Sequence, residues 1–299
     1  MQGLVLVNKP SGITSFGAVS HIKRAAKEKR VGHTGTLDPM ATGVLPVLLG
    51  RATALSSLLL DADKSYTATV RLGVKTDTDD ITGTVLEENS VFVTADQLSE
   101  AVRSFTGKIK QRPPYYSALK KDGVRLYSLA RNGERPDIPE REIEVYSAEI
   151  TKPLGANNEF SVNFHVSKGT YIRSLARDIG EYLGCGACLS ALCRTYTGGF
   201  SLSECVPLEA LTEDSISQYL FSEERAVSYL REAAVTEKQA FRFSNGGQLD
   251  FDRLKIKDIN DGELFRVKYG GLFLGIGRAD IPKNQLAVKC VINYPGDGI

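Results

Sequence analysis

Residues 32–46, GHTGTLDPMATGVLP, contain one carboxylate, Asp38, among glycine, threonine and small apolar residues. A proline follows Asp38 directly, the nearest histidine is His33, and the stretch holds neither cysteine nor lysine. A lone carboxylate could serve as a nucleophile or a proton acceptor. An Asp-Pro pair is also typical of a turn, because Asp bonds its own backbone and Pro fixes φ. On this stretch alone the turn is favoured.

Residues 77–88, DTDDITGTVLEE, resemble a calcium-binding loop in the spacing of Asp77, Asp79 and Glu88. Ile81 stands where such a loop has a ligand, and Thr82 stands where it has a glycine. We therefore expect no calcium here.

Cysteines are the other candidate metal ligands. Four of the five lie between Cys185 and Cys205, and Cys185 and Cys188 form a C-x-x-C pair. A second pair at suitable spacing is missing, so buried small side chains are favoured over a zinc site.

Motifs for nucleotides and for hydrolytic triads are missing from the sequence. There is no G-x-x-x-x-G-K-[ST], and GGLFLGIG at 270–277 lacks the spacing of a dinucleotide loop. There is no G-x-S-x-G, and the remaining histidines, His21 and His165, have no nearby partner residues. We expect no metal, nucleotide or flavin cofactor.

Composition bounds the class of protein. With 42% hydrophobic and 24% charged residues in 299, the chain suits one large globular domain or two. The first ten residues lack a basic region, and no apolar run is long enough for a membrane span. Five cysteines in so long a chain suit reduced thiols. We expect a cytoplasmic protein without membrane contact.

Basic residues are clustered although the net charge is only +1. Residues 1–35 carry six basic side chains against Glu28 alone. Residues 103–135 carry nine against two acids, with three tyrosines between them, Tyr115, Tyr116 and Tyr127. Such clusters indicate a phosphate-backbone partner, and a solvated charged face is the alternative for each.

Hydrophobic periodicity predicts the first elements. Residues 3–12 begin as a short strand, and residues 66–74 alternate as a half-buried strand. Thr94 and Gln97 have capping-box spacing and predict a helix start. Residues 14–30 predict a helix with four apolar side chains on one side: Phe16, Val19, Ile22 and Ala26.

The second half predicts more strands and one strong helix. Residues 142–150 and 159–167 alternate, and residues 171–184 have helical spacing with Gly184 as the C-terminal cap. We expect an α+β fold, a mixed, mainly antiparallel sheet with flanking helices. The predicted domains are a catalytic part, 1–235, with a mobile basic arm at about 107–139, and a small β-rich module, 236–299.

Six segments of the sequence stand out together, in this chain order: VNKPSGITS, GHTGTLDPMATGVLPVLLGRAT, DKSYTATVRLGVKTDTDD, YSALKKDGVRLYSLAR, SKGTYIRSLARDIGEYLGCGA and LCRTYTGGF. In this order they resemble the bacterial tRNA pseudouridine synthases that modify uridine 55 of the T-arm, the TruB family. The resemblance covers most of residues 3–203, and the tail weakly resembles the PUA-like RNA-binding module of such enzymes.

The resemblance implies a reaction that one carboxylate can serve. Uridine becomes pseudouridine when the N1–C1′ bond breaks, the uracil turns and C5 joins C1′. A hydrolase at such a bond needs two carboxylates, whereas here water must be kept from completing the reaction. By resemblance Asp38 is the catalytic residue. Whether it attacks C1′, attacks C6 or assists through a glycal-like intermediate stays open.

Two further catalytic residues follow from the resemblance. Tyr66 matches a tyrosine that lies against the target base and can move the C5 proton, although a core tyrosine on a strand is the plain alternative. Arg173 matches the arginine that pairs with the catalytic aspartate and stabilises its charge.

Four residues are implied to bind substrate. Tyr171 and Leu192 match pocket-lining positions, and Lys9 matches a residue near the catalytic loop. His33 matches the histidine that occupies the space left by a flipped nucleotide, as expected of enzymes that extrude a base.

The expected partner is tRNA, held at its T-stem by the basic arm, with the protein acting as a monomer. Two alternatives remain. An RNA N-glycosidase would excise the base and release uracil, and a non-catalytic RNA-binding chaperone would leave the RNA unchanged.

Overall fold

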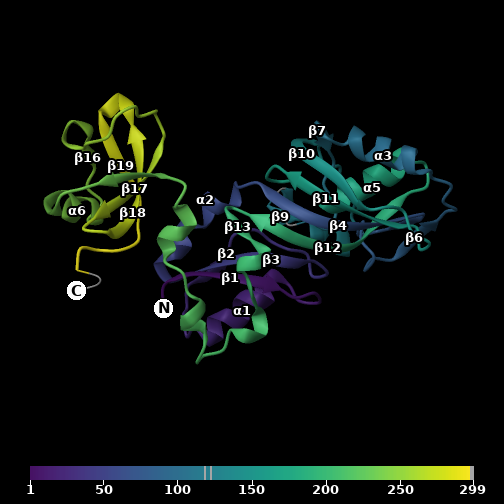
Figure 1. Ribbon diagram of the computed structural model, residues 1–299, viewed down its shortest axis with the longest axis horizontal. Helices are drawn as coiled ribbons and strands as arrows, with labels where there is room; N and C mark the ends of the chain where they lie inside the picture. Colours follow the sequence, from purple (N-terminus) through teal and green to yellow (C-terminus); the bar gives the residue numbers. More distant parts are fainter. Residues whose placement is uncertain (118, 122, 297–299) are drawn as a thin grey trace.

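Apolar runs of the sequence become the central strands of one large mixed sheet. The computed structural model describes residues 1–117, 119–121 and 123–296, and within these residues the sheet has ten strands (Figure 1). Its order is β14 (Val206–Pro207), β1 (Gly3–Lys9), β3 (Thr42–Leu49), β12 (Ala187–Thr197), β4 (Lys64–Leu72), β11 (Glu159–Val166), β10 (Arg141–Lys152) and β7 (Gly107–Gln111). Two short strands complete it: β2 (Val31–His33) pairs with β3, and β13 (Phe200–Ser201) pairs with β12.

Most of the strand pairs in this sheet are antiparallel. The exceptions among the described strands are β1 with β14 and β3 with β12. The expected mixed, mainly antiparallel α+β fold is confirmed.

Two central strands, β3 and β12, were not predicted. In β3 every residue after Thr42 is buried, so the alternation that reveals a half-buried strand is missing. Strand β4 has the expected alternation, with Tyr66 and Ala68 buried between more exposed neighbours.

Three helices pack on one face of the sheet: α1 (Ser15–Ala25), α3 (Ala95–Ser104) and α5 (Ile172–Tyr182). Their apolar side chains and the strand residues below them form one hydrophobic core. Figure 1 shows α1 beside β1 and α3 and α5 beside the opposite half of the sheet. The capping box at Thr94 and Gln97 is confirmed at the start of α3.

Helix α1 is shorter than the sequence indicated. Thr14 caps it by accepting a hydrogen bond from the Gly17 N–H. The helix ends at Ala25 instead of residue 30, because Lys27 adopts a left-handed conformation with φ of 49°. Phe16 is 74% exposed, so its assignment to the buried side was wrong. It lies one position after the buried Ser15, about 100° around the helix from the packed face.

Helix α5 carries Arg173 in its first turn and packs closely on β12. Gly184 follows the C-cap residue Leu183 with φ of 73°, which confirms the predicted C-terminal glycine. Gly180 faces β12, and a Cβ at that position would collide with the backbone N and the Cβ of Ala187.

The basic segment at 107–139 is partly regular. Its first residues form β7, the edge strand paired with β10, so their assignment to an inserted arm was wrong. The alternation of Lys108 and Lys110 with Ile109 suits this half-buried edge. The remainder contains three short elements: β8 (Lys120–Lys121), β9 (Val124–Arg125) and α4 (Leu126–Arg131).

The C-terminal part forms a second sheet of five strands. Its order is β15 (Arg231–Ala234), β17 (Leu264–Tyr269), β18 (Leu272–Asp280), β19 (Gln285–Val291) and β16 (Leu249–Asp250). The first strand of this sheet, β15, begins at Arg231, slightly before the predicted residue 236. The C-terminal part also contains a helix that was not predicted, α6 (Glu237–Ser244), which has a capping box at Thr236. One hydrophobic cluster, which includes Leu4, Val44, Phe273 and Ile276, joins this sheet to the large one.

The smaller elements complete the chain. The hairpin strands are β5 (Val74–Thr76) and β6 (Val85–Glu88), and the short helix is α2 (Ser56–Leu60). The 3-10 turns are Gly50–Leu55, Leu202–Glu204, Leu208–Ala210, Ile216–Tyr219, Glu223–Val227, Phe251–Arg253 and Ile281–Lys283.

The close contact of α5 with β12 generates a stability prediction. Gly180→Ala should lower the free energy of unfolding by about 1 to 3 kcal/mol, because the added methyl group must displace α5 or Ala187. Urea denaturation measures the decrease. Glu181→Ala, at an exposed position on the same helix, should change stability by less than about 0.5 kcal/mol. Equal stability of the Gly180→Ala and Glu181→Ala variants would contradict the tight packing.

Candidate active site

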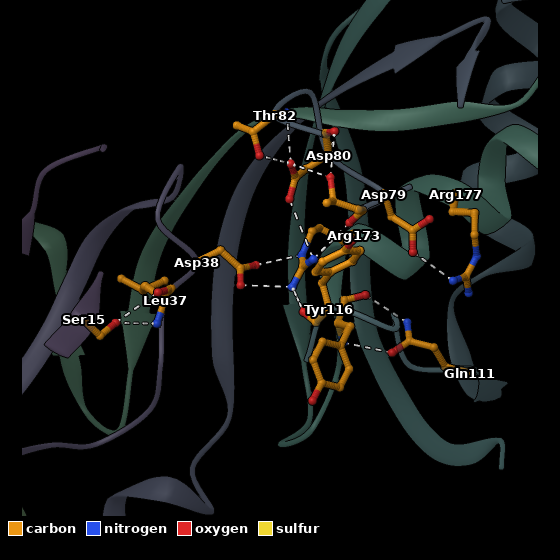
Figure 2. Close-up of polar contacts among 12 residues, drawn as sticks. Ser15, Leu37, Asp38, Asp79, Asp80, Thr82, Gln111, Tyr116, Arg173 and Arg177 are labelled. Atoms are coloured by element: carbon orange, nitrogen blue, oxygen red, sulfur yellow. Dashed lines mark hydrogen bonds and ion pairs between the residues drawn. The ribbon is translucent and has the colours of Figure 1, made fainter. Parts of the chain in front are cut away.

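The loop between β2 and β3 carries Asp38, and its backbone is fixed on both sides of that residue. Ser15 of α1 donates a hydrogen bond from Oγ to the Leu37 carbonyl at 3.0 Å and accepts one from the Leu37 N–H at 2.8 Å (Figure 2). On the other side, the Gly12 N–H donates to the Pro39 carbonyl at 2.9 Å. The residues before and after Asp38 are therefore held while its own carboxylate remains 33% exposed.

Asp38 and Arg173 form a two-bond ion pair (Figure 2). Arg173 donates from Nε to Oδ2 of Asp38 at 2.9 Å and from Nη2 to Oδ1 at 3.0 Å. The arginine side chain is only 5% exposed. Such a pair fixes the plane of the carboxylate as well as its position. The structure thus brings together two of the three predicted catalytic residues.

The other donors of Arg173 face two segments that are far from α5 in the sequence. Nη1 donates to the Thr78 carbonyl at 2.9 Å, and Nη2 donates to the Tyr116 carbonyl at 3.0 Å. The Asp80 carboxylate lies 3.7 Å from Nη1 and is itself held by bonds from Thr82 (Figure 2). A buried guanidinium needs this many acceptors, because each unpaired N–H in the interior is costly.

A second arginine pair lies next to the first. Arg177, one helical turn after Arg173, contacts Asp79 at 3.0 Å and also pairs with Asp178 at 2.8 Å. Burial raises the pKa of Asp79 to about 6, against the opposing effect of Arg177. In the stretch that resembled a calcium loop, Asp79 therefore pairs with Arg177, and Asp80 lies beside Arg173.

Lys9 contacts the backbone of the loop that carries Asp38. Its ammonium donates to the carbonyls of Pro10 at 2.7 Å, Ile13 at 2.8 Å and Pro39 at 3.3 Å, and the side chain is fully buried. Burial lowers the pKa of Lys9 to about 8, while the charge of Asp38 acts in the opposite direction. Lys9 is thus near the loop as predicted, holding its backbone.

Tyr66 and Leu192 lie in the core under the site. Both are 7% exposed and belong to the same hydrophobic cluster as Leu37. Strands β4 and β12 pair so that Leu192 stands opposite Ala68, two residues from Tyr66. Within the described residues, no hydrogen bond joins Tyr66 to Asp38.

Tyr171 is the residue before α5 and is tied to the edge strand β7. Its N–H donates to Gln111 Oε1 at 2.9 Å, and Gln111 Nε2 donates to its carbonyl at 3.0 Å. Burial raises the pKa of the Tyr171 hydroxyl. Tyr171 is therefore placed beside the pair of Asp38 and Arg173, two residues before the arginine.

His33 ends β2, at the start of the loop that carries Asp38. Its Nδ1 atom is buried, and burial lowers the pKa of the ring, with the charge of Arg194 acting in the same direction. Among the described residues, no hydrogen bond connects His33 with Asp38. The structure thus places His33 on the same loop as the carboxylate but outside its hydrogen-bond network.

Several residues of the site were missed. Asp80 and Thr78 lie in a stretch that was considered as a calcium loop and as part of the family resemblance, but neither residue was assigned a role in the site. Tyr116 contributes a backbone carbonyl, which any residue type can supply, so no sequence signal exists. Ser15 was hidden in the first turn of a helix.

Other candidate sites gain no support as metal centres. Cys185 and Cys188 are buried free thiols, and burial raises the pKa of Cys188 to about 11. In the part of the chain that the structure describes, no three His, Cys, Asp or Glu side chains gather as a metal ion would require. The same residues include no helix long and apolar enough to cross a membrane.

The fold is similar to those of two solved ribonucleoprotein chains. The archaeal box H/ACA Nop10–Cbf5 complex contains a chain that aligns with a TM-score of 0.74 and 26% identity, covering 98% of this chain and 86% of that one. A chain of an H/ACA ribonucleoprotein bound to a substrate RNA with 2′-deoxyuridine aligns with the same TM-score at 25% identity, covering 98% and 87%.

Sequence comparison agrees over nearly the whole chain. The tRNA pseudouridine synthase B of Clostridium perfringens strain 13 is 42% identical over 282 residues, 94% of this chain and 96% of that protein. The protein of the same name from Geotalea uraniireducens is 43% identical over 297 residues, 97% and 95% of the two chains. Fold and sequence together define a pseudouridylate synthase.

The family model for the N-terminal domain of TruB family pseudouridylate synthases matches residues 23–172. The model for the C-terminal domain of tRNA pseudouridylate synthase B matches residues 173–234. This chain belongs to the TruB family.

The buried Asp79 generates a prediction about pH. Its pKa in the folded protein is about 6, above the usual 3.8, so the folded state favours the protonated form. The free energy of unfolding should therefore fall as pH rises from about 4 to about 6, by at most about 3 kcal/mol from this group. Asp79→Asn should flatten that slope, measured by urea denaturation across the pH range.

The raised pKa of Asp178 leaves a smaller slope in the Asp79→Asn variant. Asp252→Asn, at an exposed site, is the control and should keep the slope of the original protein. An unchanged slope in Asp79→Asn would show that Asp79 does not titrate in this window.

Proposed function

We propose that this protein isomerises uridine to pseudouridine at position 55, in the T-arm of tRNA, with Asp38 as the catalytic residue. The observation that carries the proposal is the pair of Asp38 and Arg173. In this pair a buried guanidinium orients the carboxylate of Asp38, whose side chain is 33% exposed. The substrate class is supported by the relatives named tRNA pseudouridine synthase B.

The reaction suits a single carboxylate. The N1–C1′ bond breaks, a C5–C1′ bond forms, C5 loses its proton and N1 gains one, so the mass of the RNA is unchanged. Asp38 would act on C1′ or C6 of the nucleotide, or remove a sugar proton on the way to a glycal. Arg173 would hold the carboxylate in line and stabilise its charge after water has been displaced.

The remaining site residues would receive the base. Tyr66 would lie against the uracil and take part in moving the C5 proton, with Leu192 and Tyr171 lining the pocket. His33 would occupy the gap left in the RNA by the flipped nucleotide. Lys9 would support the loop on which the RNA lies, since its three bonds go to backbone carbonyls.

Two parts of the chain would hold the rest of the RNA. In the arm, the Arg125 guanidinium lies 5.8 Å from the ring of Tyr127, and the Arg135 guanidinium lies 5.6 Å from the ring of Tyr115. Arginine and tyrosine in this arrangement suit a phosphate backbone and exposed bases. The five-stranded C-terminal sheet would serve as a second, PUA-like RNA-binding module. A tRNA-modifying enzyme of a bacterial family would work in the cytoplasm.

The catalytic assignment is tested with a T-arm hairpin that contains a single uridine at position 55. The original protein should form pseudouridine there, mapped by derivatisation, without releasing uracil. Asp38→Asn should lower the single-turnover rate by about 10⁴-fold or more, because the amide keeps the size but loses the nucleophile. RNA affinity should change little, since phosphate and stacking contacts supply it.

Asp214→Asn is the matched control at an exposed position and should react at the original rate. Free uracil would identify an N-glycosidase instead, and unmodified RNA would favour a non-catalytic chaperone. Fast turnover by folded Asp38→Asn would reduce Asp38 to a turn residue.

The role of the arm is tested by salt dependence. Arg125→Gln and Arg135→Gln, made separately, should weaken RNA binding and flatten the slope of log affinity against log salt. The slope should change by about 0.7 to 0.9 for each phosphate group that the arm no longer neutralises. Turnover of bound RNA should fall less than affinity. Lys152→Gln, exposed at the end of β10, is the control. Slopes equal to that of the control would make the arm a solvated charged face.

A further inference from the structure

Arg194, on the central strand β12, is a fully buried arginine beside the catalytic loop. Its Nε donates to the Val44 carbonyl at 2.8 Å, and its Nη2 donates to the Gly35 carbonyl at 3.1 Å. Gly35 and Val44 bracket the segment that carries Asp38. One guanidinium therefore ties the two ends of the catalytic segment together through backbone atoms.

The position of this guanidinium is fixed by close backbone packing. Arg194 pairs with Gly43 where β12 and β3 run parallel, and any side chain at Gly43 would collide with the Arg194 backbone. At the other end, Gly35 has φ of 120°, a conformation open to glycine, and a Cβ there would lie 3.5 Å from Nη1 of Arg194. The tight contact at Gly43 fixes the backbone from which the guanidinium reaches the loop.

The charge of Arg194 is unusual in its surroundings. Within the described residues, no carboxylate forms an ion pair with it, and its bonds go to carbonyl oxygens. It lies instead among other basic groups, since its charge contributes to lowering the pKa of Lys9, His33 and Lys64. A buried cation without a partner anion is costly to the fold, so its presence calls for a reason beyond packing.

The charge of Arg194 also acts on His33, at the start of the loop. Burial is the first cause of its lowered pKa and the Arg194 charge is the second, while the Gly35 backbone acts against them. No carboxylate of the described chain contributes. Gly35, whose carbonyl accepts from Arg194, is thus also a neighbour of the His33 imidazole. Arg194 therefore acts on both His33 and the Asp38 segment.

We propose that Arg194 is a positioning residue for this loop, which holds Gly35 and Val44 at the two ends of the Asp38 segment. This rests on the proposed function. Because the charge of Arg194 also lowers the pKa of His33, that pKa reports whether the guanidinium is in place. Tying both loop ends keeps Asp38 in register with the flipped nucleotide, where a shift of about 1 Å can cost 10²-fold in rate.

Two variants separate the two effects. Arg194→Lys keeps the charge but has one nitrogen in place of the separate Nε and Nη2 donors of the planar guanidinium, and Arg194→Gln removes the charge. The single-turnover rate on the T-arm hairpin should fall by about 10- to 100-fold in both. RNA affinity should stay within about threefold, because neither variant removes an exposed cation.

The second readout is the pKa of His33, followed by NMR in the free protein. The chain has three histidines, so His21→Gln and His165→Gln assign the signals. Arg194→Gln should raise the pKa of His33 by about 0.5 to 1 unit, and Arg194→Lys should leave it within a few tenths. Arg225→Gln, which loses an arginine paired with Glu204 outside the site, should change neither the rate nor the pKa.

A normal rate in either folded variant, or an unchanged His33 pKa in Arg194→Gln, would overturn the proposal. If Arg194→Gln does not fold, Arg194→Lys decides: a lowered rate with a normal His33 pKa supports it, and a normal rate refutes it. The NMR measurement needs no RNA and so does not depend on the reaction. If the original protein makes no pseudouridine, the proposed function fails instead.

Discussion

The two hydrogen bonds between Arg173 and Asp38 impose most of the other arrangements around the site. A guanidinium that is 5% exposed must have acceptors for its remaining N–H groups, and the protein supplies them from two other segments, at Thr78 and Tyr116. The loop that carries Asp38, the turn between β5 and β6 at Thr78 and the basic segment at Tyr116 therefore meet at one side chain of α5. Close packing of Gly180 against β12 then sets how far α5 can stand from the sheet.

The loop itself is held mainly through its backbone. Lys9 bonds the Pro39 carbonyl, Arg194 bonds the Gly35 carbonyl, and Ser15 bonds both backbone groups of Leu37. Lys9 and Arg194 bind carbonyl oxygens of the loop and not its carboxylate. Among the described residues, Arg173 is therefore the one cation that forms an ion pair with Asp38. An isolated aspartate is thus oriented by one arginine and by the backbone on which it stands.

Sequence patterns predicted the elements with one solvated face and missed those with none. The alternation of β4, the apolar stripe of α5 and the capping box of α3 were readable because polar residues mark their exposed sides. Strand β3 is buried on both faces, so it has no period to detect. In β12 a buried arginine, Arg194, and two register shifts interrupt the alternation of apolar and polar residues. Asp38 and Arg173 were paired only by family resemblance, since 135 positions separate them. Arg194 was missed because its partners are carbonyls, which carry no residue identity.

The shared guanidinium also limits how the parts of the site can move. If the basic segment moved so that the Tyr116 carbonyl no longer accepted from Arg173, an N–H of Arg173 would be buried and unpaired, at a cost of about 1 to 3 kcal/mol. Arg173 would then keep its two bonds to Asp38 and its bond to the Thr78 carbonyl, and only three of its four hydrogen bonds would remain. Tyr116 and Asp38 thus share one guanidinium as a partner. A change in the arm that moves residue 116 therefore removes one of the bonds that fix the partner of Asp38, although the two residues lie on separate segments.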